Sequence, residues 1–177
     1  KILVDQWKAN PALDKNGDGV MQYVMLKGEP DNAEAVARTK FSVSTINDAG
    51  IKTEELANQV CNWQQDLAQT NMEAWLSRYG NGIEVVISNN DGMAQGAIAA
   101  LQAAGYNNGD AAKTIPVVGV DATAAAQDLI SKGFMVGSVL QDAPAMAKAL
   151  YECGMNLAAG KSATAVSYTH LTLPTIL

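Results

Sequence analysis

Short apolar runs of strand type alternate along this chain with longer stretches of helical periodicity, and this alternation constrains the fold more than any other feature. Strands are predicted at 23–26, at the end of 51–61, and at 83–87, 115–120 and 134–140, and helices at 33–49, 66–78, 91–104, 122–132 and 143–159. Buried β-branched runs that alternate with helices are typical of a parallel sheet covered on both faces. The predicted fold class is therefore α/β, with a doubly wound, mostly parallel sheet flanked by helices.

Size and composition limit the function classes that remain open. The chain has 177 residues, of which 48% are hydrophobic, which is enough for one ordinary domain and not for two full ones. No apolar run approaches the roughly 18 residues of a membrane span, so no transmembrane segment is predicted. Eighteen acidic residues outweigh 12 basic ones, and the net charge of −6 excludes nucleic acid as an expected partner. Cys61 and Cys153 are too few for a disulfide framework and are interpreted as buried thiols.

The two ends of the chain differ from its body. The chain begins without a Met, so the lack of a visible signal peptide carries no weight. The C-terminal run has no charged residue and resembles translated adapter or vector sequence, so 164–177 is predicted to be a non-native tail. It contains the only histidine, His170, and the rest of the chain therefore offers no His-based catalysis or metal binding.

Polar side chains follow the predicted strands, at the edge where α/β sheets place their ligand sites. They are found in 29–32, 62–63, 89–91, Asp121 and 141–142. No glycine-rich phosphate loop and no Ser–His or Cys–His pair occurs among them, so the chain is not expected to be an enzyme. A small α/β hydrolase that works through Asp121 or Glu29 is the catalytic alternative.

The segment 14–22 has the spacing of a calcium loop. Oxygen-bearing side chains at positions 1, 3 and 5, a glycine at 6, a carbonyl at 7 and an amide at 9 match the first half of an EF-hand loop. These positions are Asp14, Asn16, Asp18, Gly19, Val20 and Gln22. Position 12 is Met25 instead of Glu, and a strand follows instead of a helix, so the chain is not an EF-hand protein.

A calcium ion at this loop needs one more carboxylate, and Glu84 is the candidate. Glu84 lies in the apolar strand 83–87, where a buried carboxylate is costly unless it is paired or bound to a metal. Two alternatives stay open at this point. The loop is an ion-free turn rich in Asp, Asn and Gly, or Glu84 is a solvated residue at a strand end.

Five sequence motifs, in order, resemble one family. They are the loop 14–22, followed by 24–30, 83–91, 116–121 and 139–142. The series resembles the galactose/glucose-binding proteins of bacterial ABC transporters, which are type I periplasmic binding proteins, over residues 1–163. That family has two α/β lobes joined by a three-stranded hinge, and the resemblance is to the second lobe. It implies a fragment in which 1–140 is a C-terminal sugar-binding lobe with a calcium loop. Residues 141–163 would be a helix that returns to an absent N-terminal lobe. In this chain, that helix would be either exposed or docked in a different place.

The resemblance also implies roles for individual residues. The metal ligands would be Asp14, Asn16, Asp18, the carbonyl of Val20, Gln22 and Glu84. In the sugar site, Trp63 would stack on the apolar face of a pyranose, and Arg38, Asn90 and Asp121 would bond its hydroxyl groups. The remaining sugar positions depart from the family pattern, with Asn32 in place of His, Glu34 in place of Asp and Gln141 in place of Asn. From the residues alone, Trp63 is equally a core residue, Arg38 a partner in a surface ion pair, and Asn90 and Asp121 helix N-caps.

The implied function is that of a solute-binding component of a galactose/glucose-type sugar ABC importer. It would bind a monosaccharide in an interlobe cleft, hold a structural calcium ion and catalyse nothing. Its partners would be the ABC transporter membrane subunits and a chemoreceptor. It would be periplasmic or extracellular, with a signal or lipoprotein peptide upstream. The alternative is the effector-binding domain of a LacI-type sugar-responsive transcription regulator, which the calcium loop disfavours.

Overall fold

A five-stranded parallel sheet forms the centre of the molecule. The computed structural model describes residues 1–163, and the strands are β1 (Val20–Lys27), β2 (Lys52–Val60), β3 (Val85–Ser88), β4 (Val117–Asp121) and β5 (Gly137–Leu140). Their order is β2-β1-β3-β4-β5, and every neighbouring pair is parallel. The chain runs outward from β1 to β2 and then crosses back to β3, so the topological switch point lies between β1 and β3. The predicted α/β class is confirmed.

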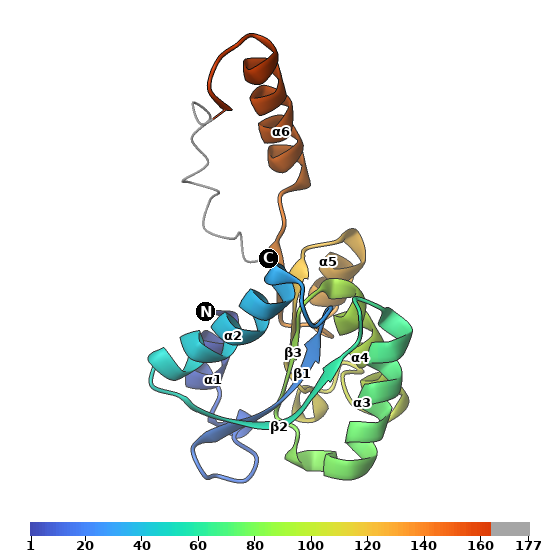
Figure 1. The fold of residues 1–177 in the computed structure, drawn as a ribbon. Helices are drawn as coiled ribbons and strands as arrows, with labels where there is room; N and C mark the ends of the chain where they lie inside the picture. Colours follow the sequence, from blue (N-terminus) through green and yellow to red (C-terminus); the bar gives the residue numbers. More distant parts are fainter. Residues whose placement is uncertain (164–177) are drawn as a thin grey trace.

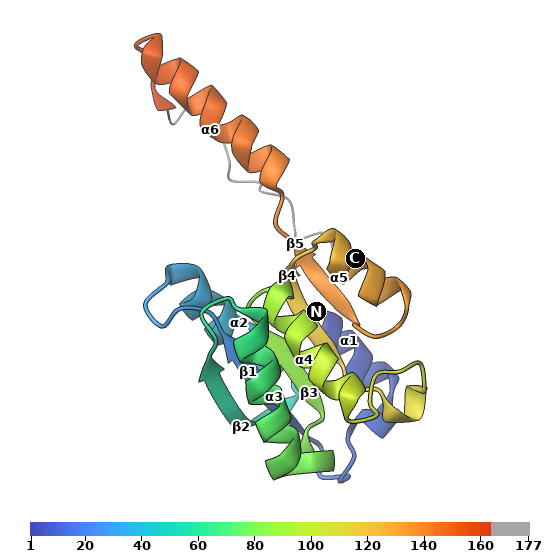
Figure 2. The same cartoon turned by 90° about the vertical axis from the view of Figure 1, so that its right-hand side faces the viewer.

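Helices cover both faces of this sheet (Figures 1 and 2). They are α1 (Ile2–Ala9), α2 (Ala33–Asp48), α3 (Gln65–Tyr79), α4 (Asp91–Ala103), α5 (Ala124–Ser131) and α6 (Ala143–Ala158), with short 3-10 turns η1 (Pro11–Leu13), η2 (Gly80–Gly82) and η3 (Ala111–Lys113). Residues of α1 and α2 share one apolar cluster, and residues of α3, α4 and α5 share the other. None of the described helices is long and apolar enough to cross a membrane.

Strand β1 shows why the sheet is buried on both sides. Met21, Tyr23 and Met25 pack into the cluster under α1 and α2, whereas Val24 and Leu26 pack into the opposite cluster. Successive side chains of a strand point to opposite faces, so the continuous apolar run 23–26 within β1 needs a cover on each face. This requirement makes β1 a central strand.

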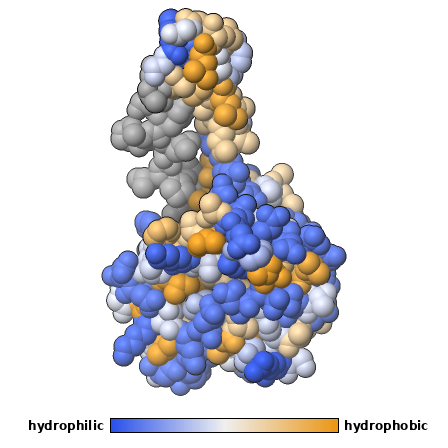
Figure 3. Space-filling view, viewed as in Figure 1, coloured by the Kyte–Doolittle hydropathy of each residue, from blue (hydrophilic) through white to orange (hydrophobic). Residues whose placement is uncertain are grey.

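Helix α6 lies apart from the layered body. The chain leaves the sheet after Leu140, and α6 extends away from the lobe (Figures 1 and 2) without a single buried residue. Its apolar side chains are exposed (Figure 3), with Leu150 at 74%, Tyr151 at 68% and Leu157 at 62%. An exposed apolar stripe of this kind is typical of a surface that packs against another body. The packing of this helix on a second lobe stays a prediction.

Several local predictions need correction. Strand β1 begins at Val20, before the predicted position 23, because the end of the loop already pairs with β2. Helix α1 and the three 3-10 turns were not predicted. Cys61 is buried as expected, but Cys153 is only partly buried because it lies on α6. The predicted tail, 164–177, and His170 lie outside the described residues.

Candidate functional site

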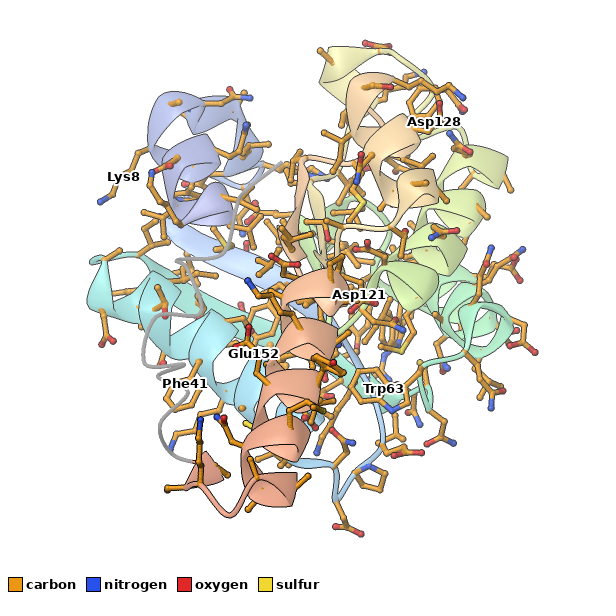
Figure 4. The ribbon with its side chains drawn as sticks, turned by 90° about the horizontal axis from the view of Figure 1, so that it is seen from above. Lys8, Phe41, Trp63, Asp121, Asp128 and Glu152 are labelled. Carbon is orange, nitrogen blue, oxygen red and sulfur yellow. The ribbon has the colours of Figure 1, made fainter. Side chains whose placement is uncertain are left out.

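An open hollow of about 260 Å³ lies at the carboxyl end of the sheet, which Figure 4 views from above. The residues that line it come from the segments after all five strands. They are Asn32, Glu34, Arg38, Trp63, Asn90, Asp121 and Gln141. The structure thus brings together all of the residues for which a sugar-binding role was predicted, at the edge where α/β sheets hold their ligands.

Arg38, on α2, contacts more of the residues around this hollow than a single ion pair would require. Its Nη1 donates to the carbonyl of Asn89 (2.8 Å), and its Nη2 donates to Oε1 of Gln141 (2.9 Å). The guanidinium also lies 3.8 Å from Oδ1 of Asp121 and 5.7 Å from the centre of the Trp63 ring. The ion pair that was the alternative role of Arg38 is thus formed with Asp121, which is itself a residue of the site. A guanidinium has five N–H donors, so donors remain for a ligand.

Trp63 follows β2 on a turn in which two non-glycine residues are left-handed. The φ angles are +49° at Asn62 and +66° at Trp63, and such angles are uncommon for residues with a side chain. The indole packs partly against the apolar cluster under α3 and α4, and its ring also lines the hollow. Trp63 is thus only partly a core residue, in contrast to Trp75, which is 8% exposed.

The two predicted helix caps have different outcomes. Asn90 caps α4, since its Oδ1 accepts from the amide of Met93 (2.9 Å), while its Nδ2 donates to the carbonyl of Trp63 (3.4 Å). Asp121 is not a cap, because Thr123 caps α5 by accepting from the amide of Ala126 (3.2 Å). Asp121 instead ends β4 with φ +123°, and its carboxylate is left for the hollow. Burial, followed by the charge of Asp91, raises the pKa of the Asp121 carboxyl despite the guanidinium of Arg38.

The predicted calcium loop lies at the opposite, amino end of the sheet and is closed by its own hydrogen bonds. Asp14 Oδ1 accepts from the amides of Gly17 (2.8 Å) and Asp18 (3.2 Å), and Asp14 Oδ2 accepts from Gly19 (2.8 Å). Oδ2 of Asp18 accepts from the side-chain amides of Asn16 (2.9 Å) and Gln22 (3.0 Å). The φ angle of +74° at Gly19 allows the sharp turn that directs these oxygens to one side.

Glu84, the residue directly before β3, reaches this loop. Its Oε1 accepts from the amide of Lys15 (2.6 Å), and its Oε2 accepts from the amide of Gln22 (3.0 Å), so one carboxylate holds both ends of the loop. Glu84 is 1% exposed, and the alternative of a solvated strand-end residue is wrong. Burial raises the pKa of this carboxyl, and the nearby charge of Asp14 acts in the same direction against the two amide bonds.

One buried atom beside Glu84 lacks a partner. Oε1 of Gln22 is buried without a hydrogen bond among the described residues, and a buried acceptor of this kind is costly unless something binds it. In residues 1–163, no three His, Cys, Asp or Glu side chains stand close enough to hold a metal ion by themselves. The amide oxygens of Asn16 and Gln22 and the Val20 carbonyl would have to complete the set. An all-oxygen set of this composition fits a hard cation such as calcium.

Comparisons with known proteins agree with the fold. The family model described as "Periplasmic binding protein domain" matches residues 1–162. The chain belongs to the periplasmic binding protein family. It is 48% identical over 164 residues to the D-galactose/methyl-galactoside binding periplasmic protein MglB of Haemophilus influenzae, covering 92% of this chain and 47% of that protein. It is 37% identical over 112 residues to the D-apiose import binding protein of Actinobacillus succinogenes, covering 63% and 34%.

Solved structures extend the comparison. An ABC transporter solute binding protein from Bacillus halodurans with bound myo-inositol is 27% identical, with a TM-score of 0.72, covering 86% of this chain and 50% of that one. One from Actinobacillus succinogenes with bound D-allose has a TM-score of 0.76 at 20% identity, which supports the fold alone, and covers 93% and 55%. The chain spans about half the length of MglB and of these two solved structures, and about a third of the D-apiose import binding protein. They are binding proteins and not enzymes, and they do not favour the regulator alternative.

Two buried polar residues of the predicted ligand-edge segment 89–91, Asn89 and Asp91, support the site although no role was predicted for either of them. Asn89 supplies the carbonyl that Arg38 binds, and Asp91 fixes the backbone behind Asp121. Asp91 accepts from the amide of Thr123 (2.8 Å) and from the hydroxyl of Ser138 (2.6 Å), which itself accepts from the amide of Ala122 (3.0 Å). The available signal was their position directly after an apolar strand, which predicts burial near the ligand edge.

Proposed function

We propose that this chain forms one sugar-binding wall of the solute-binding component of a galactose/glucose-type ABC importer. The observation that carries the proposal is the convergence of side chains from five strand ends on one hollow beside an indole. The similarity to a D-galactose/methyl-galactoside binding protein supports a monosaccharide of this kind as the ligand. Sugar binding that closes two lobes would then signal to the membrane subunits of the transporter.

The residues in the hollow suit the two faces of a pyranose. An aromatic ring such as Trp63 offers an apolar, electron-rich surface to the C–H bonds of the sugar. Arg38 donates hydrogen bonds and Asp121 accepts them, and hydrogen bonds that involve a charged group are the strong ones. Asn32, Asn90 and Gln141 add amides that both donate and accept. A neutral ligand with many hydroxyl groups matches such a mixed set better than an anion or a purely apolar molecule does.

We also propose that the loop at the amino end of the sheet holds a structural calcium ion. Asp14, Asn16, Asp18, Val20, Gln22 and Glu84 would supply the oxygens, and the buried, unpartnered Oε1 of Gln22 supports this assignment. A bound cation supplies positive charge beside Glu84 and so favours its ionised form. Because Glu84 meets the loop only in the folded chain, the ion would stabilise the fold.

Location and further partners follow from the family and belong to the same proposal. A periplasmic or extracellular site, an upstream signal or lipoprotein peptide, and docking to transporter subunits and a chemoreceptor are all consistent with it. The acidic net charge of −6 does not favour anionic lipid or nucleic acid as the partner surface.

Ligand-observed NMR tests the sugar assignment on the chain as it is. We expect saturation transfer from the protein to D-galactose or D-glucose, with a dissociation constant in the range of about 1 mM or weaker, since one wall gives incomplete desolvation. Transfer should be lost in Trp63→Ala and retained in Trp75→Phe, a conservative change in the core. The proposal is contradicted if neither sugar shows transfer, or if Trp63→Ala leaves the transfer unchanged.

A further inference from the structure

Gly28, the residue directly after β1, lies against the Trp63 indole. A Cβ atom at position 28 would lie 2.5 Å from Cε2 and from Cη2 of that ring. Non-bonded carbon atoms prefer separations of about 3.5–4.0 Å, so even a methyl group has no room there. The indole therefore occupies the space that any side chain at position 28 would fill.

Backbone conformation does not explain this glycine. Gly28 is not among the glycines with positive φ, in contrast to Gly17 (+75°) and Gly19 (+74°) in the loop at the other end of the sheet. An alanine at position 28 would thus meet the indole without backbone strain. The lower entropy of the unfolded chain with alanine would by itself stabilise the fold, so a loss of stability in Gly28→Ala reports the contact with Trp63.

Asn89 fixes the main chain of Gly28 and the side chain of Arg38 at the same time. It is 1% exposed, and its Oδ1 accepts from the amide of Gly28 (3.2 Å) and from the hydroxyl of Thr39 (3.2 Å). Its own carbonyl accepts from Nη1 of Arg38 (2.8 Å). One buried residue therefore connects the surface under the indole to the guanidinium that lies 5.7 Å from the Trp63 ring centre.

We propose that Gly28 and Asn89 are positioning residues, which set the depth of Trp63 and the place of Arg38 so that a pyranose fits above the indole. Neither residue lines the hollow. A larger side chain at position 28 would displace the indole into the hollow and take the volume that the sugar needs. The consequence for sugar rests on the proposed function, whereas the seating of the indole does not.

The first test compares Gly28→Ala with the matched variant Gly82→Ala. Gly82 has no heavy atom within 4 Å of a built Cβ and no positive φ, so its substitution introduces neither a clash nor strain. The indole N–H signal of Trp63, assigned by its loss in Trp63→Phe, should move in Gly28→Ala and stay in place in Gly82→Ala. The signals of Trp7 and Trp75 should stay in place in both. An unmoved Trp63 signal in Gly28→Ala overturns the proposal.

The second test asks whether the cost of Gly28→Ala depends on the indole. Phenylalanine has a single six-membered ring and so lacks the far part of the indole that includes Cη2, which a Cβ at position 28 would meet. Gly28→Ala should therefore lower the urea midpoint much less in a Trp63→Phe background than in the original chain. This background also keeps the test informative if Gly28→Ala alone does not fold. An equal loss of midpoint in both backgrounds contradicts the proposed contact.

Asn89 is tested by removing and then restoring its acceptor. Asn89→Ala, which no longer accepts from Gly28, should also move the Trp63 signal, and Asn89→Asp, which keeps an oxygen there, should move it less. Both Gly28→Ala and Asn89→Ala should weaken D-galactose binding by about tenfold. If the unmodified chain binds no sugar while the indole shifts occur, the proposed function fails and the positioning role stands. If sugar binds and the indole does not move, the positioning role fails alone.

Discussion

The two ends of the sheet use polar residues in opposite ways. At the carboxyl end, the strained positions belong to residues with side chains, such as Trp63 and Asp121, and their polar groups line an open hollow. At the amino end, the left-handed positions of the loop are Gly17 and Gly19, and the polar groups bond one another and the buried Glu84. Backbone strain at non-glycine residues, as at the carboxyl end, is typical of a ligand site. Glycine at the left-handed positions, as at the amino end, avoids this strain and suits a structural turn.

The largest effect is expected where the hollow depends on a buried carboxylate. Asp91→Ala removes the acceptor of the Thr123 amide and the Ser138 hydroxyl, both close to Asp121. Hydrogen bonds to a buried charged group are the costly ones to lose, so the free energy of unfolding should fall by about 3 kcal/mol in urea titrations. Asp31→Ala, at an exposed position, should change it by less than about 0.5 kcal/mol. Equal effects of the two variants would contradict a supporting role of Asp91.

Calcium should stabilise the amino end by nearly as much. An ion at 100 times its dissociation constant raises the free energy of unfolding by about 2.7 kcal/mol. Melting curves with excess calcium and with a chelator measure this shift, and Asp14→Ala, which removes the first loop oxygen, should abolish it. Identical curves for the original chain under both conditions would show that the loop holds no ion.

Glu84→Ala tests the same end without the ion. In chelator, the variant leaves the amides of Lys15 and Gln22 without their acceptor and should lose about 2 kcal/mol of stability. Burial raises the pKa of the Glu84 carboxyl, and this unfavourable effect offsets part of the stabilisation that its two hydrogen bonds supply. Glu73→Ala, on the exposed face of α3, is the matched control, and an effect as large as that of Glu84→Ala would refute the bridging role.

The smallest effect is expected at Asp121 and has the opposite sign. The raised pKa of its carboxyl means that folding disfavours the charged form, so its stabilising contribution is present at acid pH and is lost as the pH rises through the folded pKa. Asp121→Asn should therefore raise stability at pH 7 by about 0.5 kcal/mol, and this gain should disappear below about pH 4. A gain of equal size at both pH values would assign it to another cause.

Sequence patterns predicted the fold and the site to different extents. The alternation of apolar runs and helices was sufficient to predict the sheet. Parallel strands that are buried on both faces need nearly continuous runs of apolar residues, and such runs are easy to recognise in a sequence. The contact of Glu84 with the loop could be predicted because a lone carboxylate in an apolar strand needs a partner. The roles of Gly28 and Asn89 depend on contacts with Trp63 and Arg38, which are distant in sequence and meet only in the fold. Local spacing carries no signal for such contacts. The cap of α5 has a different explanation, because the helix begins at Ala124 instead of the predicted position 122, and Thr123 therefore takes the cap position in place of Asp121.

One titration tests most directly whether the carboxyl end of the sheet binds sugar and the amino end binds calcium. A ¹H–¹⁵N NMR map of the chain is recorded without ligand, then with calcium, and then with D-galactose in the same sample. We expect calcium to shift the amides of 14–22 and Glu84, and the sugar then to shift those of Trp63, Asn90 and Asp121. Sugar-induced shifts outside the hollow, or calcium-induced shifts outside the loop, Glu84 and β3, would contradict this assignment of the two ends.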